Sequence, residues 1–111
     1  MRIAVLATAL AAVASLAAPA LAGTRTVKVG DLWFVKPGGG TVTVTKGTKV
    51  TWLWVGHRPH TVTVVSGPVK FSSPVYGPPG SRYSHRMTRR GTYKIVCELH
   101  KPAMHMTLKV R

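Results

Sequence analysis

Short runs of alternating apolar and polar residues, separated by glycine and proline, constrain the fold of this chain most strongly. After residue 22 such runs predict strands at residues 27–29, 41–45, 48–55, 60–65, 82–87, 92–97 and 106–110. Turn signals rich in Gly and Pro lie between them, for example at 36–40 and 77–80. We therefore predict an all-β fold, an antiparallel Greek-key β-sandwich or small barrel of about seven to eight strands.

Several aromatic and sulfur-containing residues are expected in packing roles. Gly91-Thr92-Tyr93 opens a predicted strand and fits a tyrosine corner, in which the hydroxyl bonds back to the upstream backbone. Met87 is expected in the core. Three tryptophans are expected in the core or at its edge, with no redox role: Trp33, Trp52 and Trp54.

The first 22 residues resemble an export signal. Arg2 precedes an Ala/Leu/Val-rich run to Ala18, and small residues precede Gly23. The run is on the short side of the roughly 20 residues that a spanning helix needs, so cleavage after Ala22 is favoured over a retained anchor. We expect a signal peptide at 1–22, Sec-type export to the periplasm or the exterior, no transmembrane anchor after cleavage, and one domain at 23–111.

The domain contains one cysteine, Cys97, and therefore no internal disulfide. Small domains in oxidising compartments often depend on disulfides or a metal for stability. A lone cysteine there is a buried inert thiol, half of an intermolecular bond or a metal ligand. A bound metal would protect the thiol from oxidation, and this interpretation is favoured because His100 follows three residues later.

The charge balance restricts the partners. Residues 23–111 carry fifteen Lys and Arg against two acids, Asp31 and Glu98, a formal net charge of +13. Such a field favours an acidic redox protein or an anionic surface as partner. The basic residues are spread almost singly along the sequence, which is typical of a solvated face, so we do not expect nucleic-acid binding. We also expect a monomer.

The segment from residue 93 to residue 104 holds a set of soft and borderline metal ligands. Strand parity points Cys97 the same way as Tyr93 and Ile95, and His100 and Met104 follow across a short turn. A thiolate, two imidazoles and a thioether form a trigonal copper site with a long axial methionine. Met106 is a chemically equivalent axial candidate, but parity assigns it to the core of the last strand.

The second imidazole comes from a separate part of the chain. His60 shares a strand face with Val62 and Val64, so it points toward the core and needs a partner there. His57 is its rival, because a His57-x-x-His60 pair could chelate a metal in an exposed loop. Surface positions are expected for the other histidines, His57, His85 and His105.

These motifs resemble the blue-copper cupredoxins, the plastocyanin, amicyanin and pseudoazurin group. The resemblance rests on Pro59-His60 and on Gly91-Thr92-Tyr93 followed by Cys97-x-x-His100 and a downstream Met, and it extends from residue 27 to residue 110. It implies one copper ion, with equatorial and axial ligands at His60, Cys97, His100 and Met104. The Pro59 carbonyl would face the opposite axial position.

One position departs from the family pattern. Thr61 stands where plastocyanin-like members often have Asn after the first His, which puts in doubt the hydrogen bond that fixes the ligand loop.

The function implied is that of an exported type 1 (blue) copper protein that carries one electron between redox partners. The exposed edge of His100, near Pro102 and Ala103, would be the electron port. The alternative is a copper-binding or delivery protein without a shuttle role. A metal-free adhesin would explain the positive charge but not the spacing of the Cys, His and Met residues. An enzyme is not expected, because such a site leaves no open ligand position for substrate.

Overall fold

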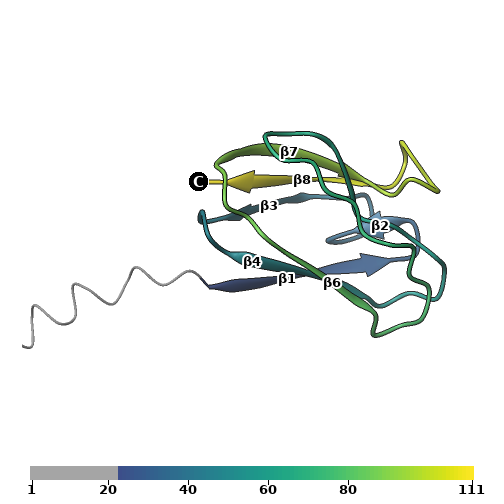
Figure 1. Cartoon of the computed structure of the whole chain (residues 1–111). Coiled ribbons are helices and arrows are strands. Elements are labelled where there is room, and N and C mark those ends of the chain that lie inside the picture. The colour runs from purple at the N-terminus through teal and green to yellow at the C-terminus, as the bar shows by residue number, and fades with distance from the viewer. Residues whose placement is uncertain (1–22) are drawn as a thin grey trace, which may run out of the picture.

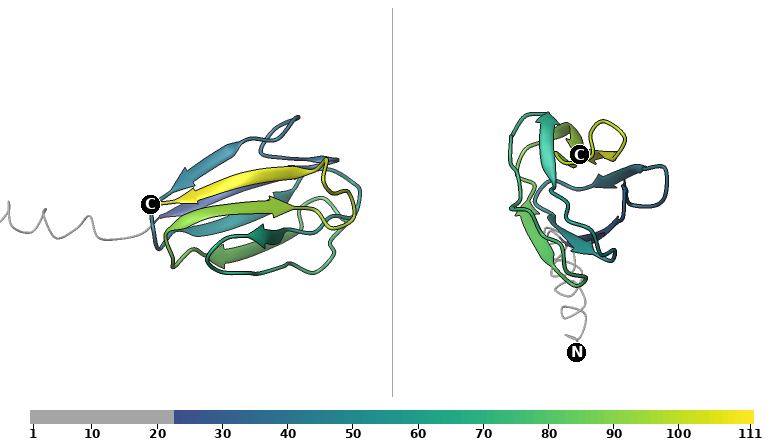
Figure 2. Two further views of the ribbon diagram at one scale, coloured as in Figure 1. Left: turned by 90° about the horizontal axis from the view of Figure 1, so that it is seen from above. Right: turned by 90° about the vertical axis from the view of Figure 1, so that its right-hand side faces the viewer.

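The chain folds into two facing β-sheets. The computed structural model describes residues 23–111, so the predicted signal peptide lies outside the described residues. Figure 1 shows the two layers, and Figure 2 (right) views them along the strands. No helix in the described part is long and apolar enough to cross a membrane.

The first sheet has the order β2-β1-β4-β6 and the second has the order β3-β8-β7-β5. The strands of the first sheet are β1 (Thr24–Gly30), β2 (Trp33–Phe34), β4 (Lys49–Trp54) and β6 (Arg82–Arg86). The strands of the second are β3 (Thr41–Val44), β5 (Thr63–Ser66), β7 (Gly91–Val96) and β8 (His105–Val110). The predicted all-β class and strand number are confirmed.

The sheets are mixed, so the prediction of purely antiparallel pairing is wrong. β1 pairs parallel with β4, and β3 pairs parallel with β8. The chain passes from β2 to β3 in the other sheet and returns as β4 beside β1, so these neighbours run in the same direction. Alternation in a sequence reports which face a residue occupies, and it carries no information on which strand lies next to it.

The inward faces of both sheets form one core, which is why the alternating pattern folds this way. The largest fully buried side chains include Trp52, Trp54, Tyr93, Ile95 and Leu108. Met87 is also buried, as predicted. Trp33 is half-buried.

The predicted tyrosine corner is present. The Tyr93 hydroxyl donates a hydrogen bond to the carbonyl of Arg89 at 2.7 Å. Burial raises the pKa of Tyr93, which keeps the hydroxyl a donor. This bond fixes the entry of the chain into β7.

Three local expectations need correction. β2 was not predicted, because a strand of two residues is too short to show an alternating apolar–polar pattern. β5 begins at Thr63, so His60 lies before the strand and is held by a bridge to Tyr76 instead. His85 is half-buried rather than a surface residue, since its ring stacks on Phe71 with centroids 4.0 Å apart.

Candidate metal centre

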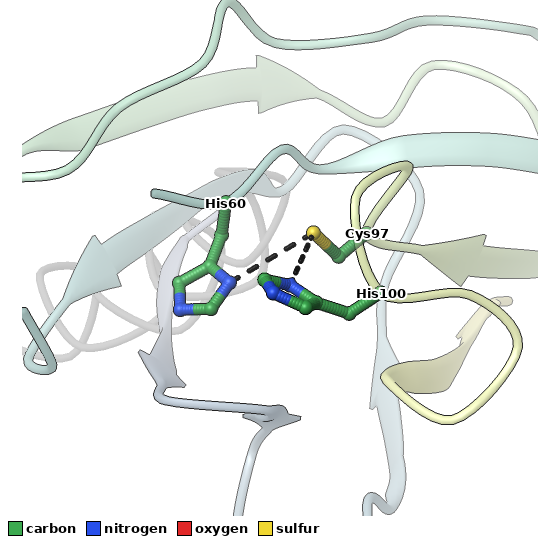
Figure 3. A group of neighbouring side chains, drawn as sticks. All are labelled: His60, Cys97 and His100. Carbon is green, nitrogen blue, oxygen red and sulfur yellow. Dashed lines mark hydrogen bonds between the residues drawn. The ribbon is translucent and has the colours of Figure 1, made fainter. Parts of the chain in front are cut away.

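Three predicted ligands converge at one end of the sandwich, which we call the site end. The donor atoms of His60, Cys97 and His100 all lie within 4.8 Å of one another. Cys97 Sγ is 3.8 Å from His60 Nδ1 and 3.5 Å from His100 Nδ1 (Figure 3). Figure 3 shows both rings turned toward the sulfur from different parts of the chain.

These separations suit one shared metal ion. First-row metals bind nitrogen and sulfur at about 2.0–2.3 Å, so two donors at trigonal angles lie roughly 3.5–4 Å apart. Both nitrogen–sulfur distances at this site fall in that range. The donor set therefore fits a copper ion in both chemistry and spacing.

The loop after β7 carries three of the predicted ligands and is closed by its own backbone. The His100 N–H donates to the Cys97 carbonyl at 3.2 Å, and the Met104 N–H donates to the His100 carbonyl at 3.2 Å. The Cys97 N–H donates in turn to the Met104 carbonyl at 3.1 Å. These bonds bring Cys97, His100 and Met104 together in a compact turn.

The two candidate thioethers have different surroundings. Met104 is fully buried within this turn. Met106 is the second residue of β8, and its sulfur accepts a hydrogen bond from the Trp52 indole N–H at 3.5 Å in the core. The contact with Trp52 engages the Met106 sulfur inside the sandwich, which favours Met104 for the metal.

His60 is fixed from its backbone. Its N–H donates to the Tyr76 carbonyl at 2.9 Å, and the Tyr76 N–H donates to the His60 carbonyl at 3.1 Å. The His60 side chain is fully buried, whereas its rival His57 is exposed. The structure therefore brings His60 rather than His57 to the cysteine, although His60 lies before β5 and not within it.

Asp31, which sequence reasoning did not assign to the site, holds the far side of this imidazole. Its Oδ1 lies 3.1 Å from His60 Nε2. Hydrogen bonds from the Arg58 N–H, the His57 N–H and the His60 side chain lower the pKa of Asp31 to about 2. A carboxylate that is ionised at neutral pH can only accept, so Nε2 carries the proton and donates.

That hydrogen bond decides which nitrogen faces the cysteine. Burial lowers the pKa of His60, so the ring is neutral and has one lone pair, which lies on Nδ1. Gly56 makes the contact possible, since a Cβ there would lie 2.8 Å from the Asp31 backbone nitrogen. The only sequence signal was that Asp31 is one of two acids in a very basic domain.

Thr61 joins the two chain segments that supply the ligands. Its N–H lies 3.5 Å from Cys97 Sγ, and its hydroxyl accepts a hydrogen bond from the Glu98 N–H at 2.9 Å. The doubt about a fixing hydrogen bond at this departure from the family pattern is thus resolved, because threonine makes the link.

The surface around the site exposes both apolar and charged side chains, the charged ones including Arg58 and Lys101. His100 is half-buried, so one edge of its ring reaches solvent. Four large apolar side chains lie exposed in the segments that carry the site: Leu32, Val55, Val75 and Leu99. Pro102 and Ala103 are also exposed.

The family pattern described as copper binding proteins, plastocyanin/azurin family, matches residues 22–111. This chain belongs to that family. The cupredoxin fold and a single copper ion predicted from the sequence are confirmed by this match together with the three converged donors.

Solved structures agree with the assignment. The chain is 26% identical to a methionine-to-leucine mutant of amicyanin in its oxidised state, with a TM-score of 0.66, covering 78% of this chain and 81% of that one. It is 26% identical to a reduced tryptophan-to-tyrosine mutant of amicyanin, with a TM-score of 0.67 and coverages of 85% and 88%.

A more distant likeness shows the fold alone. A purple cupredoxin from Nitrosopumilus maritimus is 20% identical, with a TM-score of 0.64, covering 78% of this chain and 99% of that one. No curated protein matches the chain significantly.

Proposed function

We propose that this cupredoxin is an exported type 1 (blue) copper protein that carries one electron between redox partners. The observation that carries the proposal is the buried Cys97 sulfur within 3.8 Å of two imidazole nitrogens. Copper bound there would supply a Cu(I)/Cu(II) couple. Export rests on the leader-like sequence of residues 1–22.

In this proposal His60, Cys97 and His100 would hold the ion, with Met104 as a weaker fourth ligand. His60 is held by two backbone hydrogen bonds with Tyr76 and by the Asp31 carboxylate at Nε2. The turn from Cys97 to Met104 is closed by backbone hydrogen bonds. Donors held this firmly change position little between oxidation states, which favours fast electron exchange.

The partner docks at the site end. Of the three donor residues only His100 is partly exposed, and Leu99 beside it and Leu32 beside Asp31 are exposed apolar residues. A small apolar patch suits a brief encounter, because it buries little surface and dissociates quickly. No substrate pocket is needed for such a role, so we do not expect an enzyme.

Asp31 has a positioning role toward the metal. Its carboxylate keeps the proton on His60 Nε2 and leaves Nδ1 free to bind. The negative charge of the Asp31 carboxylate, next to a ligand ring, also stabilises Cu(II) relative to Cu(I) and so lowers the reduction potential. Asp31→Asn should raise the potential. Glu98→Gln is the control, since that acid is paired with Lys101 at 3.4 Å on the surface.

Adding Cu(II) to the purified protein tests the ligand set. We expect an intense blue absorption from thiolate-to-copper charge transfer, abolished in Cys97→Ser and lost in His60→Ala. His57→Ala is the matched control and should keep the colour, since His57 is exposed. A pale complex that is insensitive to Cys97→Ser would contradict a blue copper site.

A pair of leucine variants tests the axial ligand. Met104→Leu should keep the blue colour and raise the reduction potential, because a thioether is removed from the metal. Met106→Leu should leave the potential near that of the parent and reduce stability, because the Trp52 N–H loses its acceptor. The reverse outcome would assign the axial position to Met106.

A further inference from the structure

Six exposed cations gather at the end of the sandwich opposite the metal centre. We call this set the cationic pole, and it consists of Lys46, Lys49, Arg86, Arg89, Arg90 and Arg111. In Figure 1 it is the end where the C-terminus is marked, while the loop after β7 lies at the other end. Six of the fifteen Lys and Arg residues that are spread along residues 23–111 are therefore gathered at one end of the fold.

Contacts between strand ends bring four of these residues together, and the pairing of Gly91 with Val110 brings Arg90 close to Arg111. Lys49 opens β4 and pairs with Arg86, the last residue of β6. The Arg86 guanidinium donates to the Gly47 carbonyl at 2.7 Å, and the Lys46 N–H donates to the Arg111 carbonyl at 2.7 Å. The turn between β3 and β4 thus contacts two other segments, the end of β6 and Arg111.

No acidic side chain balances this charge in residues 23–111. Asp31 and Glu98 are the only two acids there, and both lie at the site end. Like charges held together without counter-charges repel one another and lower stability. The six exposed cations of the pole add nothing to the packing of the core. A role in binding an anionic partner would explain why they lie together.

We propose that the cationic pole docks on the surface of an anionic phospholipid bilayer, with headgroup phosphates as its ligands and the metal centre facing away. The pole offers charge beside small polar neighbours such as Thr45, Gly47 and Thr88. The exposed large apolar residues are Leu32, Val55, Val65, Val75 and Leu99, and none of them belongs to the pole.

This composition favours a lipid surface over a protein partner or a single-stranded nucleic acid. A protein partner is held mainly by buried aromatic and apolar anchors, and single-stranded nucleic acid is held by aromatic stacking platforms. A charged bilayer needs neither, because it attracts each Lys or Arg near its surface through the summed field of many headgroups. The pole matches that requirement.

The position of the pole makes the two surfaces compatible. A protein bound through Lys46, Arg89 and Arg90 keeps His100 and the apolar residues around it on the side away from the bilayer. Docking to lipid therefore leaves the site end free for a redox partner.

The test compares two triple variants of the exported, copper-loaded protein with equal changes in net charge. The pole variant is Lys46→Gln, Arg89→Gln and Arg90→Gln. The matched control is Lys28→Gln, Lys36→Gln and Arg82→Gln, three exposed residues outside the pole. Binding is measured on vesicles of equal parts phosphatidylglycerol and phosphatidylcholine, on pure phosphatidylcholine vesicles, and on soluble polyphosphate.

Each pole charge removed should weaken binding to the anionic vesicles about fivefold, so the triple variant loses roughly a hundredfold. The control should change by no more than a few-fold, and added salt should release the parent protein. Equal losses in both variants would overturn the proposal, because net charge alone would then explain binding.

Two further results would also overturn it. If vesicle binding is unchanged by added salt and by the pole substitutions, another part of the chain binds the membrane. Loss of polyphosphate binding in the pole variant with vesicle binding intact would make the pole a site for soluble polyanions. Unchanged blue absorption in both variants confirms that each is folded.

Discussion

The two ends of this sandwich differ in almost every property. The site end carries buried donors, exposed apolar side chains and both acids of the domain, whereas the cationic pole carries six exposed cations. The six residues of β8, at about 3.3 Å each, separate the ends by roughly 20 Å. Screening in physiological salt acts over about 8 Å, so charges at one end barely reach the other. A small β-sandwich can therefore keep two surfaces electrically independent.

The largest expected effect is the stabilisation of the fold by copper, which depends on the site end and not on the cationic pole. Copper bound only by the folded state should raise the free energy of unfolding by about 4 kcal/mol when free copper exceeds its Kd a thousandfold. Thermal unfolding with and without copper measures this. The pole triple variant should show the same gain as the parent. Equal unfolding temperatures with and without copper would show that the site end does not bind the ion in the folded state.

Replacing Thr61 tests the link between ligand segments. Thr61→Val leaves the Glu98 N–H without its acceptor, so we expect a loss of about 1–3 kcal/mol in urea unfolding and a changed blue spectrum. Thr61→Ser keeps the hydroxyl and should retain most of the stability. An equal loss in the serine variant would assign the effect to packing of the methyl group.

Replacing Tyr93 tests a structural feature outside the site end. Tyr93→Phe removes the hydrogen bond to the Arg89 carbonyl and should cost about 1 kcal/mol in urea unfolding. The blue absorption and the reduction potential should not change, because this end is remote from the metal. A shifted potential would show that the two ends are coupled through β7.

The smallest effect concerns His85, which lies next to Arg86 of the pole. Burial lowers the pKa of His85 below its usual 6.5, so the folded state favours the neutral ring. Stability from this residue is present above pH 6.5 and is lost as the pH falls through that value. His85→Gln should flatten this part of the stability–pH curve in the copper-loaded protein. A curve that keeps its shape would assign the slope to other groups.

Local spacing made the centre of the site predictable. Cys97, His100 and Met104 occupy one short turn, so their proximity follows from sequence separation alone. His60 required only the correct face of a segment, and its side chain is buried although the strand itself begins later. Features that depend on one element or one face could thus be predicted.

Features that depend on which segments become neighbours could not. Asp31 reaches His60 across 29 positions, and no local pattern links them. The parallel pairing of β1 with β4 has the same origin, because parity does not encode strand order. The six cations of the pole are dispersed in the sequence for the same reason. They become neighbours only where the ends of different strands lie together.

The two hydrogen bonds of Thr61 also bear on strand register. β5 pairs with β7 irregularly, with a shift between Val64 and Ser66 that lets one strand advance relative to the other. Thr61 binds two consecutive residues, Cys97 and Glu98, through its N–H and its hydroxyl. A slip of one residue would break both contacts at once. The register shift lies further along β5 from the ligands than Thr61 does, so the Thr61 contacts align His60 with Cys97 ahead of it.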